Sequence, residues 1–412
     1  MRTVLLLSLS VMFSGFAYAQ KPAKEPTKKE PPKAAKDLKQ EAKNSKKTPT
    51  EPKKVAKKSA AEEALAAEMQ SKGLVEAGGA WVDKQHVEDA KRGVFHWNDE
   101  IVTKSDYNSL QSGKVRHAVT GELIEAADLE KSRGRSFPIE GGKKWVEEKE
   151  ADAFHAKDGQ PWTLTSQNYV FVSTLPIAKL ESLREHGDRA IARLATVLGD
   201  ARPLPVHKPT VIIASTQDAF VRLGTQIGDE GSAYGGFLAR EEAKLELPNG
   251  VEVRPAVCLW DESWGPYYLP HAIGLAQAHG LAASGDAELP AWLLQGLAAL
   301  GSRFGNAETG KWFCQNLAKS GGLKPVDKFV SGFAIDGEMD SDSISANLTQ
   351  AGFLLDFAAS GGDKDSAAAL TAFGEALRAQ KESGIDKAAN ALQSTLLKAL
   401  DNANKHFQKL IR

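Results

Sequence analysis

The sequence predicts an α+β fold, in which a small module of short repeats precedes a small mixed sheet with a β-hairpin and then a mostly helical half. Runs of β-branched residues at 168–175 and 210–216 are typical of strands in a sheet interior. Helical periodicity dominates after residue 267, most clearly at 344–360 and 388–410. The change from strand patterns to helix patterns along the chain indicates the α+β class.

The sheet and the hairpin are predicted between residues 161 and 260. Segment 177–199 carries apolar residues at helical spacing, so an amphipathic helix should connect the two strands. Residues 244–260, "KLELPNGVEVRPAVCLW", alternate between apolar and polar on both sides of Pro248-Asn249-Gly250. An Asn-Gly turn between alternating runs indicates a hairpin.

The first nineteen residues have the features of a secretory signal peptide. Arg2 supplies a positive charge, residues 4–16 are mainly apolar, and Ala17-Tyr18-Ala19 forms an A-x-A cleavage site. An uncleaved membrane anchor is the alternative, but the apolar run is shorter than the ~20 residues that span a bilayer. We therefore expect the protein to be secreted, periplasmic or held in the cell envelope.

Residues 20–62 predict a disordered basic tail. Residues 20–60 contain 14 lysines, five acidic residues and six prolines, which gives a net charge of +9 and almost no large apolar side chain to bury. Since the whole chain carries −1 and Arg2 adds one positive charge, residues 61–412 carry −11. The tail either adheres to an anionic envelope polymer or membrane surface, or is a solvated spacer. It lacks interleaved aromatic side chains, so we expect no specific nucleic-acid binding.

Residues 63–160 predict a small accessory module built from short repeats. Four segments each begin with a bulky apolar pair and continue with a polar amphipathic stretch: "WVDKQHVEDAKRG" from Trp81, "IVTKSDYNSLQSG" from Ile101, "LIEAADLEKSRG" from Leu123 and "WVEEKEADAF" from Trp145. A short strand followed by a short helical turn fits each segment, and the first three close on glycine. Chance similarity among charged surface segments is the alternative. No catalytic grouping is visible in this part of the sequence.

The domain predicted at 161–412 contains the most specific motif. "LPAWLLQGLA" at 289–298 resembles the "LPxWLxEGLA" of the peptidase-MA-like branch of the gluzincin zinc peptidases, whose core is thermolysin-like. The predicted order of strand, helix, strand, hairpin and two helices is similar as well, over roughly residues 165–360. The resemblance implies a helix with an HExxH motif, a second helix that supplies a glutamate ligand, and zinc with an open position for water.

Placed on this sequence, the family motif retains one zinc ligand. His271 matches the first histidine, whereas Ala272 stands at the general-base position and Leu275 at the position of the second histidine. Gln295, twenty residues beyond Leu275, stands where the family has its glutamate. One imidazole and one neutral amide do not make a zinc site. His271 is thus a weak candidate ligand, and we expect no catalytic residue and no cofactor.

A rearranged metal site near His271 is the alternative, and it would make the protein a zinc-dependent hydrolase or peptidase. It would combine His271 with His279 and with Asp286 or Glu288 from the following loop. The two histidines lie eight residues apart on one predicted helix, so the helix would have to end near Gly280 for both to reach one ion.

Aromatic residues gather near the starts of these helices: Trp264, Tyr267, Tyr268, Trp292 and Trp312. They either line a retained cleft that holds a peptide or a glycan by stacking, or they pack in the core. Both interpretations stay open at this point.

Two interpretations also stay open for the two cysteines. Cys258 and Cys314 either form a disulfide in an oxidising compartment or remain buried thiols. Their spacing does not match a structural zinc site.

These observations favour a secreted, catalytically inactive metallopeptidase-like protein that acts as a binding or structural module of the cell envelope. The sequence contains no GxSxG nucleophile elbow, no Walker loop, no GxGxxG after a strand and no EF-hand loop. Other common catalytic machineries are therefore not indicated.

Overall fold

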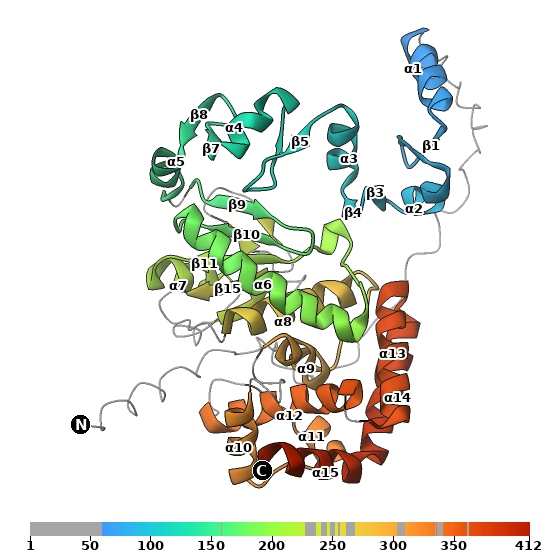
Figure 1. Ribbon diagram of the computed structural model, residues 1–412, viewed down its shortest axis with the longest axis vertical. Helices are drawn as coiled ribbons and strands as arrows, with labels where there is room; N and C mark the ends of the chain where they lie inside the picture. Colours follow the sequence, from blue (N-terminus) through green and yellow to red (C-terminus); the bar gives the residue numbers. More distant parts are fainter. Residues whose placement is uncertain are drawn as a thin grey trace, which may run out of the picture.

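Figure 1 shows a computed structural model of the protein. It describes residues 60–157, 159–226, 268–302, 310–333, 335, 341–360 and 362–412, and short segments at 236–239, 245–247, 252–253 and 256–260. Helices and small sheets are both present, so the predicted α+β class is confirmed. The predicted signal peptide and most of the predicted tail lie outside the described residues. Helix α1 (Ala60–Ser71) begins just before the predicted end of the tail.

Four antiparallel β-hairpins, each followed by a helical segment, form the N-terminal part of the described chain. The hairpin strands are β1 (Leu74–Ala77), β2 (Ala80–Asp83), β3 (Phe95–Trp97), β4 (Glu100–Val102), β5 (Val115–Arg116), β6 (Leu123–Ile124), β7 (Ser136–Ile139) and β8 (Lys144–Glu147). The helical segments are η1 (Lys84–His86) with α2 (Val87–Lys91), α3 (Lys104–Gln111), η2 (Ala126–Asp128) with α4 (Leu129–Arg133), and α5 (Glu148–His155). Whether these four hairpin–helix units are copies of one repeat stays a prediction.

A five-stranded mixed sheet follows, with the strand order β12-β15-β11-β10-β9. The three inner strands run parallel, and both edge strands are antiparallel to their neighbours. The strands are β9 (Trp162–Thr165), β10 (Val170–Ser173), β11 (Thr210–Ala214), β12 (Gly236–Ala239) and β15 (Ala256–Trp260). The strands predicted at 168–175 and 210–216 are confirmed as β10 and β11, and helix α6 (Ile177–Leu198) connects them as predicted.

The predicted hairpin is confirmed only for its inner residues, as a separate two-stranded sheet, because residues 256–260 of its second arm form β15 inside the five-stranded sheet. Strand β13 (Leu245–Glu246) pairs antiparallel with β14 (Glu252–Val253). The turn residues 248–251 lie outside the described part. Helix α7 (Gln217–Thr225) precedes this region and contacts β11 and β15.

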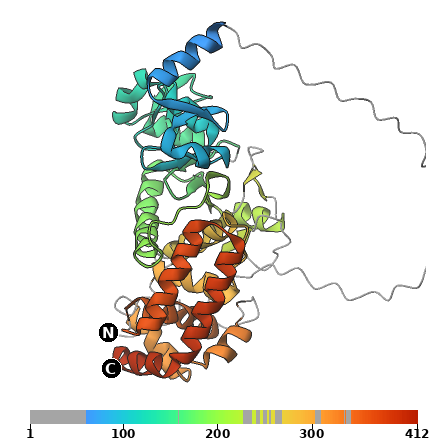
Figure 2. The same cartoon turned by 90° about the vertical axis from the view of Figure 1, so that its right-hand side faces the viewer.

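The C-terminal half is helical, and its helices pack below the sheet in Figure 1. They are α8 (Tyr268–Ala283), α9 (Ala291–Gly301), α10 (Lys311–Lys319), α11 (Val326–Ser331), α12 (Ser341–Ser360), α13 (Lys364–Ala379), α14 (Glu382–Lys398) and α15 (Leu400–Ile411). Helices α13 and α14 lie side by side (Figure 2). The helix predicted at 344–360 is confirmed as α12.

The helical segment predicted at 388–410 is confirmed, but it belongs to two helices, because the chain bends at Ala399 between α14 and α15. The bend turns α15 across α10 and α12 (Figure 1). There the Phe407 ring meets that of Phe353, with 5.1 Å between their centroids. The helical spacing of apolar residues continues through Ala399, so the sequence pattern does not show where α14 ends. The contact between α15 and α12 does show it.

Helix α9 is buried on every side. All residues from Trp292 to Leu300 are buried, between α6, α8 and α12. Glycine permits this close packing, because a Cβ on Gly296 would lie 2.9 Å from the Ala351 carbonyl oxygen of α12. Within the described residues, every helix is too short or too polar to cross a membrane.

We predict that Gly296→Ala destabilises the protein by about 1–3 kcal/mol, because the added methyl group overpacks against the backbone of α12. Gly384→Ala is the matched control. Its Cβ would have only the Lys381 side chain nearby, at 4.0 Å, so removing a helical glycine there should stabilise the protein by no more than about 1 kcal/mol. Urea unfolding of both variants measures the two effects. If both substitutions changed the free energy of unfolding equally, the tight packing of α9 against α12 would be contradicted.

Candidate functional site

His271 and Gln295 meet in the helical core. His271 lies in the first turn of α8, and Gln295 lies near the middle of α9. Both residues are 0% exposed, and His271 Nε2 lies 2.9 Å from Gln295 Oε1. The structure thus brings together the two polar residues of the degenerate motif, which lie on separate helices.

This hydrogen bond sets which nitrogen of His271 carries the hydrogen, and burial sets the charge of the ring. Since a carbonyl oxygen can only accept, His271 Nε2 carries the hydrogen and donates it to Gln295. Burial lowers the pKa of His271 to about 4, and the hydrogen bond to Gln295 opposes this in part. The imidazole is therefore neutral at pH 7. Because Nε2, the nitrogen that faces α9, carries the hydrogen, it has no free lone pair to bind a metal ion.

The other two motif positions are part of the apolar core. Ala272 is 0% and Leu275 is 1% exposed. Neither side chain can bind a metal ion or transfer a proton. Gln295 Nε2 has no hydrogen-bond partner among the described residues, and its amide carries no charge to balance a dication. The zinc ion that the resemblance implies does not fit the residues present around His271.

The rearranged metal site is not formed, because α8 continues without a break to Ala283. The expected helix end near Gly280 is wrong. Glycine is needed there for close packing, since a Cβ would lie 2.6 Å from the His207 carbonyl oxygen. His271 and His279 are separated by eight residues of continuous helix, about 12 Å along its axis, which is too far to share one ion.

The two acidic candidates of this alternative come after the end of α8. Asp286 lies in the turn that follows, with a left-handed backbone at φ 54°. Within the part of the chain that the structure describes, neither Asp286 nor Glu288 joins His271 or His279 in a group of three side chains able to hold a metal.

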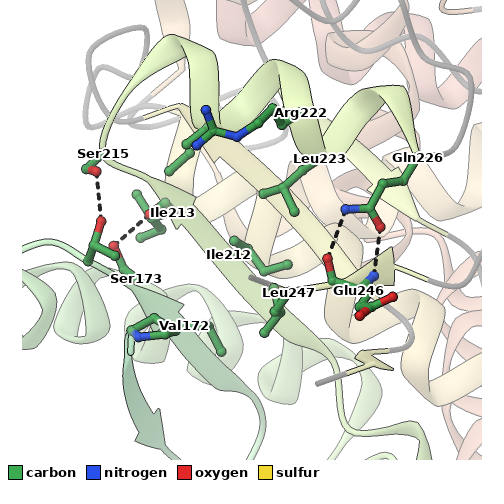
Figure 3. A pocket seen from close by; sticks show the side chains of 14 residues that line it. Val172, Ser173, Ile212, Ile213, Ser215, Arg222, Leu223, Gln226, Glu246 and Leu247 are labelled. Carbon is green, nitrogen blue, oxygen red and sulfur yellow. Dashed lines mark hydrogen bonds between the residues drawn. The ribbon is translucent and has the colours of Figure 1, made fainter. Parts of the chain in front are cut away.

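One cavity, of about 290 Å³, lies beside the sheet and α7 (Figure 3). Val172 and Ile212 face it from β10 and β11, and Leu223 faces them from α7. Gln226 closes one side, since its amide pairs with the backbone of Glu246 at 2.9 and 2.8 Å. The wall is mainly apolar and does not include His271 or Gln295, so it offers few groups that could recognise a peptide or a glycan.

A second cavity, of about 330 Å³, has a more polar wall and lies beside α8. Gln277, which is 1% exposed, forms part of it, and neither its Oε1 nor its Nε2 has a hydrogen-bond partner among the described residues. Asp188 and Arg202 line the same cavity. A buried amide is costly unless water or a ligand pairs with it. This cavity is therefore the better candidate for a binding site.

Of the five aromatic residues, the structure describes the side chains of two, and these lie in different surroundings. Trp292 is 1% exposed and packs in the core, whereas Trp312 is 50% exposed on α10. Trp264 and Tyr267 lie outside the described residues, and so does the side chain of Tyr268. Core packing is thus the correct interpretation for Trp292.

Cys314 is a buried free thiol on α10. Burial raises its pKa to about 11, and the nearby Asp356 carboxylate acts in the same direction. Cys258 lies on β15, and its side chain is not among those described. Of the two interpretations, a disulfide or buried thiols, the structure shows a buried thiol for Cys314.

Two features were not predicted from the sequence. One is the buried amide of Gln277, which had no local signal because it lies in an apolar helix. The other is a group of three side chains in the first two hairpin–helix units, His86, Asp89 and His96. The one signal for this group in the sequence was that two of the nine histidines, His86 and His96, lie within eleven residues of each other.

The comparisons with known proteins add no relative. No protein-family model matches the chain, and no curated protein matches it. The resemblance to the peptidase-MA-like gluzincins therefore stays a prediction that rests on the residues quoted above.

We predict that His271 makes the free energy of unfolding depend on pH. The unfolded histidine takes up a proton near pH 6.5, whereas the folded one does so only near pH 4, so stability falls as the pH drops between these values. The loss should reach about 3 kcal/mol at pH 4. Urea unfolding of the wild-type protein and of His271→Gln, at steps from pH 7 to pH 4, measures it as the difference between the two curves.

Leu275→Met is the control for this experiment, because it perturbs the same helix without changing a titratable group. Its difference from the wild-type protein should stay constant with pH. If the His271→Gln difference is equally constant, His271 is not buried as a neutral side chain.

Proposed function

We propose that the protein is a secreted pseudopeptidase, which keeps the two-helix scaffold of the peptidase-MA-like gluzincins without their zinc site. It would act as a binding or structural module of the cell envelope. The observation that carries this proposal is the buried hydrogen bond between His271 and Gln295. The pair joins two helices at the motif positions, while its neutral groups cannot hold a dication.

The order of elements supports the proposed ancestry. Strand β10, helix α6, strand β11, hairpin β13–β14 and helices α8 and α9 come in the order that the resemblance implies, with the 3-10 turn η3 (Pro205–His207), helix α7 and strands β12 and β15 between them. The motif residue of each helix points to the other helix. An imidazole that faces an amide between α8 and α9 is the arrangement that loss of a shared ligand would leave, and their hydrogen bond offsets part of the cost of burying both groups.

The replaced side chains are consistent with a lost activity. With Ala272 and Leu275 in the apolar core, no general base and no second imidazole remain. Gln295 has the size of glutamate but is neutral, so it can be buried without the cost of an unpaired carboxylate.

The binding role is proposed for the cavity at Gln277 and for the basic tail. The open amide donor and acceptor of Gln277 suit a peptide group or the hydroxyl groups of a glycan. Residues 20–60, with their net charge of +9, suit an anionic envelope polymer or membrane surface. One polymer of the envelope, peptidoglycan, offers glycan, peptide and carboxylate groups together.

We predict that the double variant Leu275→His with Gln295→Glu gains one zinc ion per chain relative to the wild-type protein. The two substitutions restore the imidazole one turn from His271 and the carboxylate on the next helix. Elemental analysis of dialysed protein measures the gain, and circular dichroism confirms the fold of each variant.

Each single substitution is a control, since two of the three ligands should hold zinc poorly. Adding His271→Ala to the double variant should abolish the gain. A folded double variant that gains no zinc would show that α8 and α9 lack the spacing of a gluzincin site. Zinc in the wild-type protein that disappears in His271→Ala would contradict the pseudopeptidase proposal itself.

We predict that the full chain binds insoluble peptidoglycan through two separable contributions. Deletion of residues 20–60 should remove the part of the binding that salt weakens, because that part is electrostatic. Gln277→Leu should remove the part that persists at high salt, because the cavity then loses its open amide. Co-sedimentation at low and high salt measures both.

Gln393→Leu on α14, away from this cavity, is the matched control and should bind as the wild-type protein does. Unchanged binding after the deletion would leave the tail as a spacer. Unchanged high-salt binding of Gln277→Leu would rule out the cavity.

A further inference from the structure

Three side chains with metal-binding chemistry meet between the first two hairpin–helix units. His86 ends η1, Asp89 lies in α2, and His96 lies in β3. One nitrogen or carboxylate oxygen from each lies within 4.8 Å of those of the other two. Elsewhere in the part of the chain that the structure describes, no other group of three or more such side chains comes together in this way.

The three side chains contact one another closely, and His86 Nε2 also lies 3.1 Å from the Gln85 side-chain amide nitrogen, which a metal ion would replace. His96 Nε2 lies 2.9 Å from Asp89 Oδ2, and the rings of His86 and His96 are stacked with 4.2 Å between their centroids. Arg92 pairs with the other carboxylate oxygen, Oδ1, and keeps the pKa of Asp89 below its ordinary value together with His96. The Arg92 side chain is 68% exposed, so it can leave the carboxylate when a cation arrives.

We propose that His86, Asp89 and His96 form a binding site for a divalent transition-metal ion, with zinc as the ion that its ligands fit well. Two imidazoles and one carboxylate are typical zinc ligands, whereas magnesium and calcium prefer oxygen ligands alone. Three protein ligands leave a fourth position for water. The stacked rings must turn until their lone pairs converge, and the side chains of Asp89 and His96, 30% and 25% exposed, leave room for that movement.

The location gives the ion a structural effect. His86 and Asp89 follow hairpin β1–β2, whereas His96 belongs to the next hairpin, β3–β4, which lies beside α2 in Figure 1. The ion would thus join two consecutive units, which otherwise share a small core that includes Val82, Phe95 and Tyr107. Binding to the folded state alone raises stability with the concentration of the ion.

The open position would face a large cavity. Asp89 and His96 line a cavity of about 760 Å³, and so do Arg202, which pairs with Asp200, and Arg378, which donates to the Leu198 carbonyl oxygen. A ligand that completes the coordination shell, such as a carboxylate, would meet these two cations in the same cavity. The site is separate from His271 and does not depend on the proposed function.

Equilibrium dialysis of the full chain, produced without a polyhistidine tag, against Zn²⁺ alone tests the site. We expect one zinc ion per chain and a melting temperature that rises with zinc. His96→Gln and Asp89→Asn should each weaken binding more than the roughly 10- to 100-fold that loss of an outer-shell partner costs. Asp89→Asn keeps the shape of the side chain, so it remains informative if His96→Gln does not fold.

The controls match both ligand types. His186→Gln changes a histidine on α6, and Asp128→Asn changes a carboxylate that pairs with a cation three residues on, as Asp89 does. Both should bind zinc as the wild-type protein does. Absence of stoichiometric zinc, or zinc binding that His96→Gln and Asp89→Asn leave unchanged, would overturn the site.

His271→Ala separates this proposal from the proposed function. Zinc that persists in His271→Ala and is lost in Asp89→Asn supports both. No zinc at all overturns the site at His86, Asp89 and His96 and leaves the pseudopeptidase proposal intact. Zinc that is lost in His271→Ala and persists in Asp89→Asn contradicts both.

Discussion

The complete burial of α9 is the constraint on which the rest of the larger domain depends. A helix that is apolar on all sides can exist only inside a core. Helices α6 and α8 pack on one part of α9, and α12 packs on another. Helix α9 therefore links the helices next to the sheet with the C-terminal helices. Gly274 and Gly296 allow the approach, since a Cβ on either would lie within about 3 Å of a neighbouring backbone.

This burial decides which chemistry the degenerate motif can support. A glutamate at position 295 without a cation beside it would be an uncompensated buried charge, whereas Gln295 accepts the hydrogen of His271 at little electrostatic cost. The same desolvation keeps His271 neutral. Leu275 and Ala272 complete the apolar packing. The neutral and apolar side chains at these four positions are therefore suited to a fully buried core.

Much of the larger domain could be predicted from the sequence, because β10, α6, β11 and α12 are long enough to show a clear period. The resemblance to the gluzincin motif implied that His271 and Gln295 lie on neighbouring helices, and the structure shows them in contact. The first strands of the hairpins, such as β3 and β5, are too short for any period. The bend at Ala399 and the meeting of His86 with His96 depend on contacts between elements, which no local pattern encodes.

The most direct test of the central claim is the ¹⁵N chemical shifts of the His271 imidazole at pH 6, assigned by comparison with His271→Gln. We expect a neutral ring with its hydrogen on Nε2, unchanged when a metal chelator is added, because the ring is buried and donates to Gln295. An imidazolium ion, or an Nε2 shift that responds to zinc and is reversed by the chelator, would contradict it.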